Sequence, residues 1–399
     1  MSESSLTTAI NTVSEKLEKD SSLMIIFSDD ADGVAAAAIA SYLAEKLNNE
    51  YTLVCLDKVF PEALEMIFRE DYNQYMFLDL GGPIHVMIPE KMRRRVYIID
   101  HHEEVIEVPH NIPYINPTKF KLSGDYATTS TILYFIYKHR FGKDKDVAWI
   151  SLIGIGEVKG EFKGLNWRAF AEAELLGVAR RAIRGDKMSF HIHVKGYSRE
   201  ITSLYKDITL ASSVGYYADG PLRVVEALIF KDFRMIKEDA SRYKIVRQDA
   251  YKRGIEALEK EGLFQLKRVQ WFMDTGIFNS MGTRVFDSFT SYVRFQGRLV
   301  FKNKYILGLM RRQKKIPGLG NLRETWTNVA IRVPRYLETL ILSNNAQSVV
   351  ALAEAVAYQV GGLGYGYQTL GAATIPSSSE DSFIKMFNEL ASEVYQLGD

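Results

Sequence analysis

The sequence predicts an α/β protein built around a mostly parallel sheet. Four short apolar runs of strand length cover residues 23–28, 51–56, 74–79 and 95–100. The segments between the earlier runs have helical spacing, as in Val34 to Leu47. Strands that alternate with helices favour parallel pairing, because each helix carries the chain back across one face of the sheet.

The later parts of the chain differ in composition, and 399 residues are many for a single hydrophobic core. Residues 129–139 and 166–184 have helical patterns, and mixed helical segments follow, with charges of both signs over 231–260. β-branched and aromatic runs return after residue 265, for example at 298–301 and 305–307. We therefore predict a first domain over 1–185, a helical insert over 186–265 and a second, smaller α/β domain over 266–399.

Composition excludes several classes of protein. The formal net charge of +1 argues against a generally basic nucleic-acid coat, so any polyanion site must come from a local cluster. The single cysteine, Cys55, excludes an internal disulfide and fits a reducing compartment. No run approaches the ~18 apolar residues of a membrane span, and the N-terminus lacks the pattern of a signal peptide. A cytoplasmic protein without a membrane partner is expected.

Acids and imidazoles follow three of the four predicted strands, namely Asp30 and Asp32, Asp79, and Asp100 with His101 and His102. Open α/β sheets place ligands beyond the carboxyl ends of their strands, where these side chains would converge. Two acids that are two residues apart would face the same way on an extended chain. A mixed oxygen and nitrogen set suits Mn, Mg, Zn or Fe. Turns and helix caps explain any one of these acids, but three coincident strand ends favour a metal site.

Residues 266–315 form a basic segment in which 11 Lys and Arg face 2 Asp, a net charge of 11 − 2 = +9. Aromatic residues interleave with the cations, a combination that lets a groove track a phosphate backbone while rings stack on bases. Single-stranded nucleic acid is the expected ligand, with Arg284, Arg298, Arg311 and Arg312 as candidate contacts. For any single aromatic residue, a place in the core of the second domain is the more common alternative.

These motifs together resemble the DHH phosphoesterase superfamily, nearest to its archaeal RecJ-like branch, which includes the RecJ-derived accessory subunit of the CMG helicase. The first set of motifs is Asp30-Ala31-Asp32-Gly33, Asp79 and Asp100-His101-His102. The second set resembles the associated substrate-binding (DHHA1) domain and comprises Ala330-Ile331-Arg332, Gly361-Gly362-Leu363-Gly364-Tyr365-Gly366-Tyr367 and Gly371-Ala372-Ala373.

The resemblance implies up to two Mn or Mg ions that share Asp79. The first ion would be held by Asp30 and by position 28, and the second by Asp32, His101 and Glu157. His102 would lie beside the scissile phosphate. The second domain would contact nucleic acid through Arg332, Gly364, Gly366 and Tyr367.

Three positions depart from the family pattern. Ser28 replaces a histidine, Glu157 replaces an aspartate, and Tyr367 stands where a histidine faces the phosphate. A neutral hydroxyl is a poor ligand for a divalent cation, so the first ion site is weakened. Tyrosine cannot carry a proton and positive charge near neutral pH as imidazole does.

We therefore favour a catalytically weakened, RecJ-like protein of DNA replication that binds single-stranded DNA and joins GINS and an MCM-type helicase. An active Mn- or Mg-dependent single-strand exonuclease is the alternative, since five expected metal ligands remain. A phosphodiesterase acting on short oligonucleotides or cyclic dinucleotides is a third hypothesis, which explains the basic segment less well.

Overall fold

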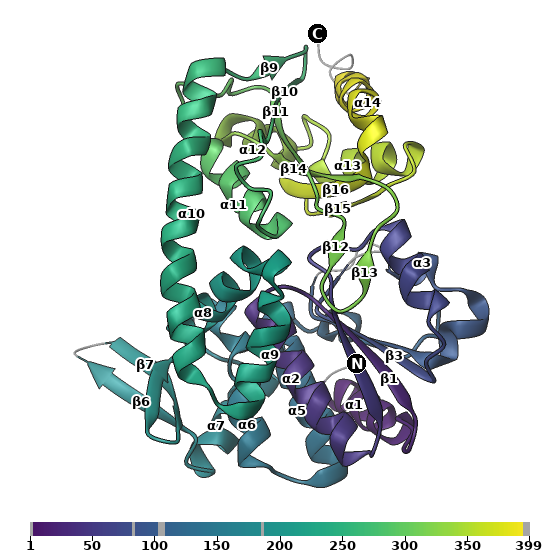
Figure 1. The fold of residues 1–399 in the computed structure, drawn as a ribbon, viewed down its shortest axis with the longest axis vertical. Coiled ribbons are helices and arrows are strands. Elements are labelled where there is room, and N and C mark those ends of the chain that lie inside the picture. The colour runs from purple at the N-terminus through teal and green to yellow at the C-terminus, as the bar shows by residue number, and fades with distance from the viewer. Residues whose placement is uncertain (1–2, 82–83, 103–107, 185–186, 394–399) are drawn as a thin grey trace.

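The computed structural model describes residues 3–81, 84–102, 108–184 and 187–393, which form two lobes, each with a sheet between helices (Figure 1). The sheet of the first lobe is parallel throughout and has the strand order β2-β1-β3-β4-β5. Its strands are β1 (Ser22–Phe27), β2 (Glu50–Cys55), β3 (Gln74–Leu78), β4 (Val96–Ile99) and β5 (Tyr114–Ile115). The predicted parallel sheet is confirmed.

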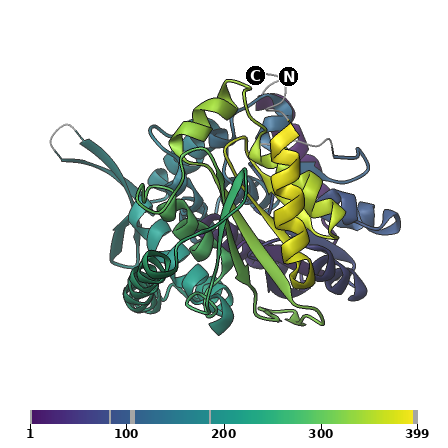
Figure 2. The same ribbon diagram turned by 90° about the horizontal axis from the view of Figure 1, so that it is seen from above.

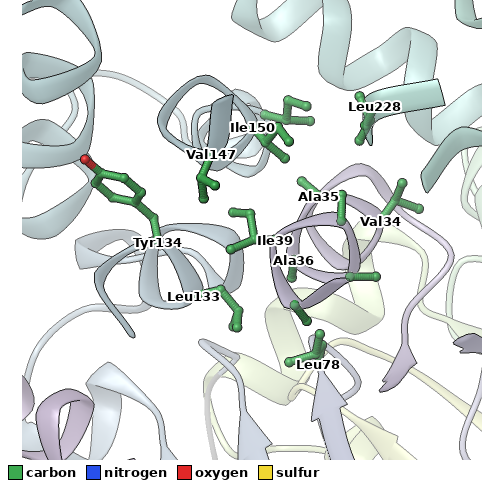
Figure 3. Close-up of a cluster of buried hydrophobic side chains, with 14 of the residues drawn as sticks. Val34, Ala35, Ala36, Ile39, Leu78, Leu133, Tyr134, Val147, Ile150 and Leu228 are labelled. Carbon is green, nitrogen blue, oxygen red and sulfur yellow. The ribbon is translucent and has the colours of Figure 1, made fainter. Parts of the chain in front are cut away.

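Apolar side chains cover both faces of this sheet. On one face, Val34 and Ile39 of α2 pack among Leu133, Ile150 and Leu228, which come from three other helices (Figure 3). The helices of this face are α1 (Glu3–Lys16), α2 (Ala31–Lys46), α5 (Thr129–Phe141), α6 (Lys145–Ser151) and α9 (Gly220–Phe230). The other face is covered by α3 (Pro61–Arg69) and α4 (Ile84–Met87).

Strand order reverses next to β1, because β2 pairs on one side of it and β3 on the other. The connections that leave β1 and β3 therefore diverge, and a crevice opens at the carboxyl ends of these strands. This is the edge at which the sequence places its acids.

The middle of the chain is only partly helical, which corrects the prediction for 166–184 and for the insert. Helix α7 (Gly164–Leu175) ends before Gly177, which adopts φ +74°, and a three-stranded antiparallel sheet follows. Its strands are β6 (Ala179–Arg184), β7 (Lys187–Val194) and β8 (Tyr197–Glu200). Strand pairing and the burial of Ile192 and Val194 override the helical propensity of this region. The predicted boundary between 185 and 186 lies outside the described residues.

Three helices then lead to the second lobe: α8 (Ile201–Val214), α9 and α10 (Phe233–Glu261). The charged pattern over 231–260 is confirmed as a helix, since α10 runs for 29 residues along both lobes (Figure 1). The β6–β7 hairpin projects from the body of the molecule in both ribbon views (Figure 2).

The second lobe is the predicted smaller α/β unit. Its sheet has the order β15-β16-β14-β11-β10-β9, in which only β10 and β11 pair in parallel. The strands are β9 (Phe264–Gln265), β10 (Val269–Met273), β11 (Tyr305–Arg311), β14 (Trp326–Arg332), β15 (Leu363–Gly366) and β16 (Leu370–Pro376), with a short hairpin of β12 (Lys315–Ile316) and β13 (Gly320–Asn321). The run at 298–301 is a turn rather than a strand.

Helices cover both faces of this second sheet as well. Those on one face are α12 (Arg335–Leu342), α13 (Val349–Gln359) and α14 (Glu380–Glu393), and α11 (Thr283–Val293) packs with α10 on the other. Within the part of the chain that the structure describes, no helix combines the length and the apolar character needed to cross a membrane.

Candidate functional site

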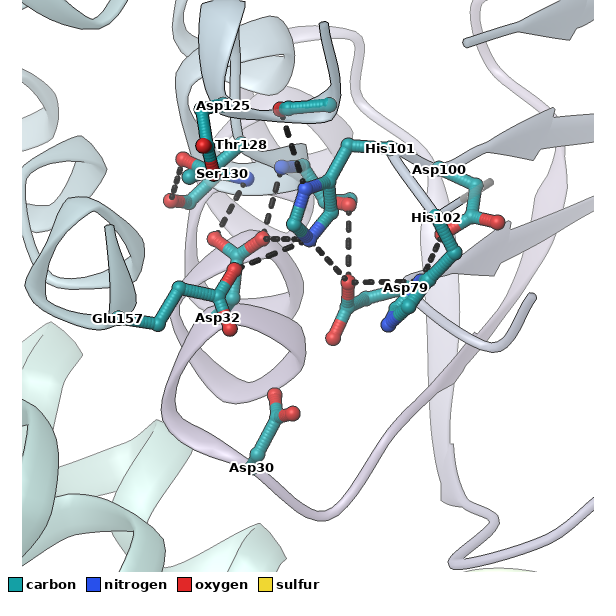
Figure 4. A network of polar contacts seen from close by, with 12 residues as sticks. Asp30, Asp32, Asp79, Asp100, His101, His102, Asp125, Thr128, Ser130 and Glu157 are labelled. Carbon is teal, nitrogen blue, oxygen red and sulfur yellow. Dashed lines mark hydrogen bonds and ion pairs between the residues drawn. The ribbon is translucent and has the colours of Figure 1, made fainter. Parts of the chain in front are cut away.

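The acids and imidazoles predicted to converge do so around His101, which follows β4 (Figure 4). Its Nε2 atom lies 3.0 Å from Oε1 of Glu157, 3.4 Å from Oδ1 of Asp79 and 3.7 Å from Oδ2 of Asp32. His101 Nδ1 lies 3.3 Å from the carbonyl oxygen of Gly124, which orients the ring. Three carboxylates from separate elements thus face one imidazole nitrogen.

This cluster fits a divalent ion. Apart from the ion-pair contacts just given, the buried atoms His101 Nε2 and Glu157 Oε1 have no hydrogen-bond partner among the described residues. Two sets of donors lie within 4.8 Å of one another, Asp32 with His101 and Glu157, and Asp79 with His101 and His102. Carboxylate oxygens suit Mn or Mg, and an imidazole nitrogen also suits Zn or Fe. The ligands expected for the second ion are therefore together.

Protons are held tightly in this cluster. Burial lowers the pKa of His101, but contacts with Asp79 and Glu157 outweigh it and raise the pKa well above its usual value. Burial and the neighbouring Asp30 charge raise the pKa of Asp79 well above its usual value. The His101 proton therefore neutralises charge that a metal ion would otherwise neutralise.

We expect Mn²⁺ binding to release protons and to tighten as pH rises. An ion must displace the His101 proton, and a raised pKa keeps that proton bound to higher pH. Titration calorimetry in buffers of different ionisation enthalpy, repeated at several pH values, measures both effects. An affinity that does not change with pH would contradict the assignment of His101 as a ligand.

Asp32 also has a structural role at the start of a helix. Its carboxylate accepts the backbone N–H groups of Thr129 (2.7 Å) and Ser130 (3.0 Å), in the first turn of α5. This interaction is favourable because unsatisfied N–H groups and the helix dipole attract an anion there. A Cβ atom on Gly154 would lie 1.7 Å from Asp32 Oδ1, so only glycine leaves room for this carboxylate.

Asp30 lies apart from the cluster (Figure 4), which corrects the expectation that Asp30 and Asp32 face the same way. The chain is not extended here, because Asp30 is the N-cap of α2 and Asp32 already belongs to its first turn. The Asp30 side chain accepts the N–H of Gly33 at 3.1 Å.

A guanidinium from the second lobe binds the first acids. Arg284 of α11 donates from Nε to Asp29 Oδ1 (2.8 Å), and its Nη2 lies 2.9 Å from Asp30 Oδ2. Burial raises the pKa of Asp30, but the Arg284 charge and hydrogen bonds lower it more, and the net shift is downward. The Ser28 hydroxyl lies 2.8 Å from Asp79 Oδ2 and 3.1 Å from Asp30 Oδ1. Arg284, predicted to contact nucleic acid, thus forms an internal ion pair.

The pairing of Asp29 with Arg284 was missed from the sequence. Asp29 is fully buried, and burial raises its pKa to about 6 despite the nearby Arg284. The only local signal was an extra acid beside Asp30, and its partner is 255 positions away along the chain.

His102 is held at the mouth of the cluster by Asp100, with 2.6 Å between His102 Nδ1 and Asp100 Oδ1. Burial lowers the pKa of His102, but the Asp100 carboxylate more than compensates and raises it to about 9. The ring therefore carries a positive charge at neutral pH. Asp79, which lies beside it, has φ +58°, a left-handed conformation that aspartate and asparagine tolerate better than most residues.

A cavity of about 320 Å³ lies between the lobes and is lined by both of them. The first lobe contributes Ser28, Lys58, Asp79, Gly81 and His102, and the second lobe contributes Arg284, Asp287, Arg332, Tyr365, Gly366 and Tyr367. Arg332 is nearly buried and donates to the carbonyl oxygens of Asp287 and Gly371. Asp79 and His102 at the edge of the cluster thus face the same space as the glycine-rich strands.

Gly364 does not line this cavity, which corrects its place among the nucleic-acid contacts. It packs against α13, where a Cβ atom would lie 2.2 Å from the carbonyl oxygen of Ala353. The glycine is explained by close packing of β15 on a helix.

Much of the charge of the basic segment is neutralised within the fold. Five of its eleven cations pair with acids from outside 266–315, namely Arg284, Arg294, Arg311, Arg312 and Lys315. Arg312 is buried against Asp57, so its predicted contact with nucleic acid is wrong. Arg311 is exposed but paired with Glu380 at 2.8 Å. The segment's sequence charge therefore overstates its surface field.

The aromatic residues of the same segment divide into two groups. Phe272, Phe286 and Phe289 fill the core beneath α11, and Tyr305 lies in the core on the other face. The second group, Tyr292, Phe295 and Phe301, is exposed near the end of α11 and in the segment that follows. With the exposed Arg298 and Lys302 and with Tyr336 of α12, it forms what we call the α11 surface. Arg294 stacks on Phe295 (4.6 Å) and Lys302 lies over the Tyr336 ring (5.3 Å).

No protein-family model matches the sequence, and no curated protein does. Solved structures do match. A manganese-bound exonuclease RecJ superposes with a TM-score of 0.62 over 97% of this chain and 94% of its own, at 13% identity. CDC45 from Entamoeba histolytica gives a TM-score of 0.56 over 98% and 99% of the two chains, at 10% identity.

This chain has a RecJ-like fold. RecJ from Thermus thermophilus in complex with Mn²⁺ also matches, with a TM-score of 0.60 at 14% identity, and the match covers 97% of this chain but only 55% of that protein. The DHH domain of a member of a ribosomal protein family matches with a TM-score of 0.54 at 12% identity. RecJ structures thus contain Mn²⁺ or Mg²⁺, and this chain presents acid and histidine clusters suited to a metal at the edge of its first sheet.

Proposed function

We propose that this protein binds single-stranded DNA in DNA replication, with hydrolysis that is weak or absent, as an accessory subunit of a CMG-type helicase. The observation that carries the proposal is the shared cavity. It joins Asp79 and His102, at the edge of the candidate metal cluster, to the cations and glycine-rich strands of the second lobe. Two of its lining residues, Ser28 and Tyr367, lack the family's imidazoles.

Asp32, Asp79, His101 and Glu157 would hold a Mn²⁺ or Mg²⁺ ion, which would supply Lewis acidity toward a phosphate oxygen. His102 is charged at neutral pH and faces the cavity, so it would donate a hydrogen bond to the same phosphate. Arg332 would add positive charge around the strand, whereas the Lys58 charge is balanced by Asp287 at 2.9 Å.

Weak hydrolysis follows from groups that the cavity lacks. Tyr367 is 40% exposed and faces the cavity, where a histidine would supply a proton and charge. Ser28 offers a neutral hydroxyl that is already directed at Asp30 and Asp79. Phosphate binding survives these changes because it needs cations and hydrogen-bond donors rather than proton transfer.

The α11 surface would extend the strand-binding path outside the cavity. Exposed rings stack on bases with little regard to sequence, and adjacent cations attract the phosphates. Arg332, which lines the cavity, donates from Nε to Ser291 on the same helix at 2.6 Å. The cavity and the α11 surface are thus connected through α11.

End-labelled single strands incubated with the protein and Mn²⁺ test the proposal. Tight binding without cleavage in any divalent metal is the expected result. Cleavage by the native protein that is abolished in Asp79→Ala would instead establish the alternative function, an active Mn- or Mg-dependent single-strand exonuclease. The intact cluster around His101 is the observation that favours this alternative. Co-purification of the native protein with MCM and GINS tests the helicase assignment, and failure to recover either would reject it.

We expect strand binding to weaken steeply with salt and to depend on the α11 surface. Reversing the exposed Arg298 to Glu should reduce affinity about tenfold at low salt and flatten the salt dependence, because a phosphate contact is lost. Arg234→Glu, at an 87% exposed site on α10, is the matched control. Fluorescence anisotropy across a salt series measures both; equal effects of the two reversals would remove the α11 surface from the path.

A further inference from the structure

The acids of the first lobe divide into two groups with different neutralising partners. Asp32, Asp79 and Glu157 face His101 Nε2. Asp29 and Asp30 face Arg284 instead, at 2.8 and 2.9 Å. Neither potential metal-binding set among the described residues contains Asp30.

We propose that the Arg284 guanidinium is a built-in cation that replaces one metal ion, so that this chain binds a single divalent ion beside His101. The proposal goes beyond the proposed function, because it concerns the metal stoichiometry of the protein whether or not a strand is bound.

Both carboxylate oxygens of Asp30 already have partners within the protein. Oδ2 lies 2.9 Å from Arg284 Nη2, and Oδ1 accepts the Gly33 N–H and lies 3.1 Å from the Ser28 hydroxyl. Asp30 is 4% exposed and Asp29 is fully buried, so both charges need a partner within the protein. A fixed guanidinium meets this need and repels a divalent cation at the same position.

The second lobe delivers this cation, and its backbone is anchored where it does so. Arg284 lies in the first turn of α11, and the N–H of the preceding Thr283 donates to Asp57 Oδ2 at 2.8 Å. Lys58 also pairs with Asp287 of α11 at 2.9 Å. The charges of Asp29 and Asp30 are thus neutralised by a contact between the lobes and not by an ion bound from solvent.

The test counts ions. Titration calorimetry with Mn²⁺ alone and electron paramagnetic resonance of the loaded native protein should give one equivalent and the spectrum of an isolated ion. Two equivalents, an exchange-coupled pair or no binding would overturn the proposal. Strand binding is measured separately, so failure of the proposed function leaves this result unchanged.

Variants locate the ion and the substitute cation. Asp30→Asn should keep the single ion with an affinity changed by less than about tenfold, whereas loss of the ion would place it at Asp30 and overturn the proposal. Arg284→Lys should keep one equivalent, because an ammonium retains the charge.

The double change Ser28→His with Arg284→Ala should bind a second equivalent of Mn²⁺. A double variant that is folded by circular dichroism yet binds only one equivalent would contradict the replacement of an ion by Arg284. The native ion count and Asp30→Asn decide the question if the double variant does not fold.

Discussion

Replacing Arg312 with alanine should lower the free energy of unfolding by about 3–5 kcal/mol, the cost of breaking a buried charged pair. Arg312 and Asp57 side chains are 1% and 0% exposed, and the guanidinium also lies 4.8 Å from the Phe60 ring. Without the guanidinium, the charge of the Asp57 carboxylate stays buried between the lobes. The Thr283 N–H still donates to this carboxylate, but it is neutral and does not balance the charge. Urea denaturation followed by circular dichroism measures the loss.

The neighbouring residue supplies a matched control. Arg311 is 61% exposed and pairs with Glu380, so Arg311→Ala should cost about 1 kcal/mol or less. The double change Asp57→Asn with Arg312→Met should recover part of the Arg312→Ala loss, because no uncompensated charge remains buried. Equal destabilisation by Arg311→Ala and Arg312→Ala would show that Arg312 is not a structural ion pair.

Replacing Asp79 with asparagine should weaken Mn²⁺ binding by about 100-fold or more, since even residues that only orient metal ligands contribute about 10–100-fold. Asp79 Oδ1 lies 3.4 Å from His101 Nε2 at the centre of the cluster. Asparagine is the appropriate replacement because it tolerates the φ of +58° found here and keeps an oxygen toward the Thr129 hydroxyl. Titration calorimetry measures the affinity.

Two further measurements make this result interpretable. Asp71 has a side chain that is 95% exposed, and Asp71→Asn should leave Mn²⁺ affinity unchanged. A melting temperature of Asp79→Asn close to that of the native protein would show that the fold is retained. Native affinity in a folded Asp79→Asn protein would exclude the cluster around His101 as the metal centre.

Local patterns in the sequence predicted the first sheet and most of the residues that gather around His101. Strand length, helical spacing and acids at strand ends are properties of neighbouring residues, and a parallel sheet necessarily places its carboxyl ends at one edge. Asp79, His101 and Glu157 therefore lie close together, as that pattern and the family resemblance led us to expect. The antiparallel strands at 179–200 were missed because pairing with partners, rather than local propensity, determines them.

The sequence alone therefore determined which chemical groups reach the sheet edge and that the fold resembles RecJ. Only the tertiary structure decided which positive charges remain available to a ligand. Arg284 and Arg312 each pair with an acid of the other lobe that is 255 positions away along the chain. A charge counted along the chain acts on a ligand only if no acid from another element neutralises it. The packing of the two lobes, and not the composition of 266–315, sets that balance.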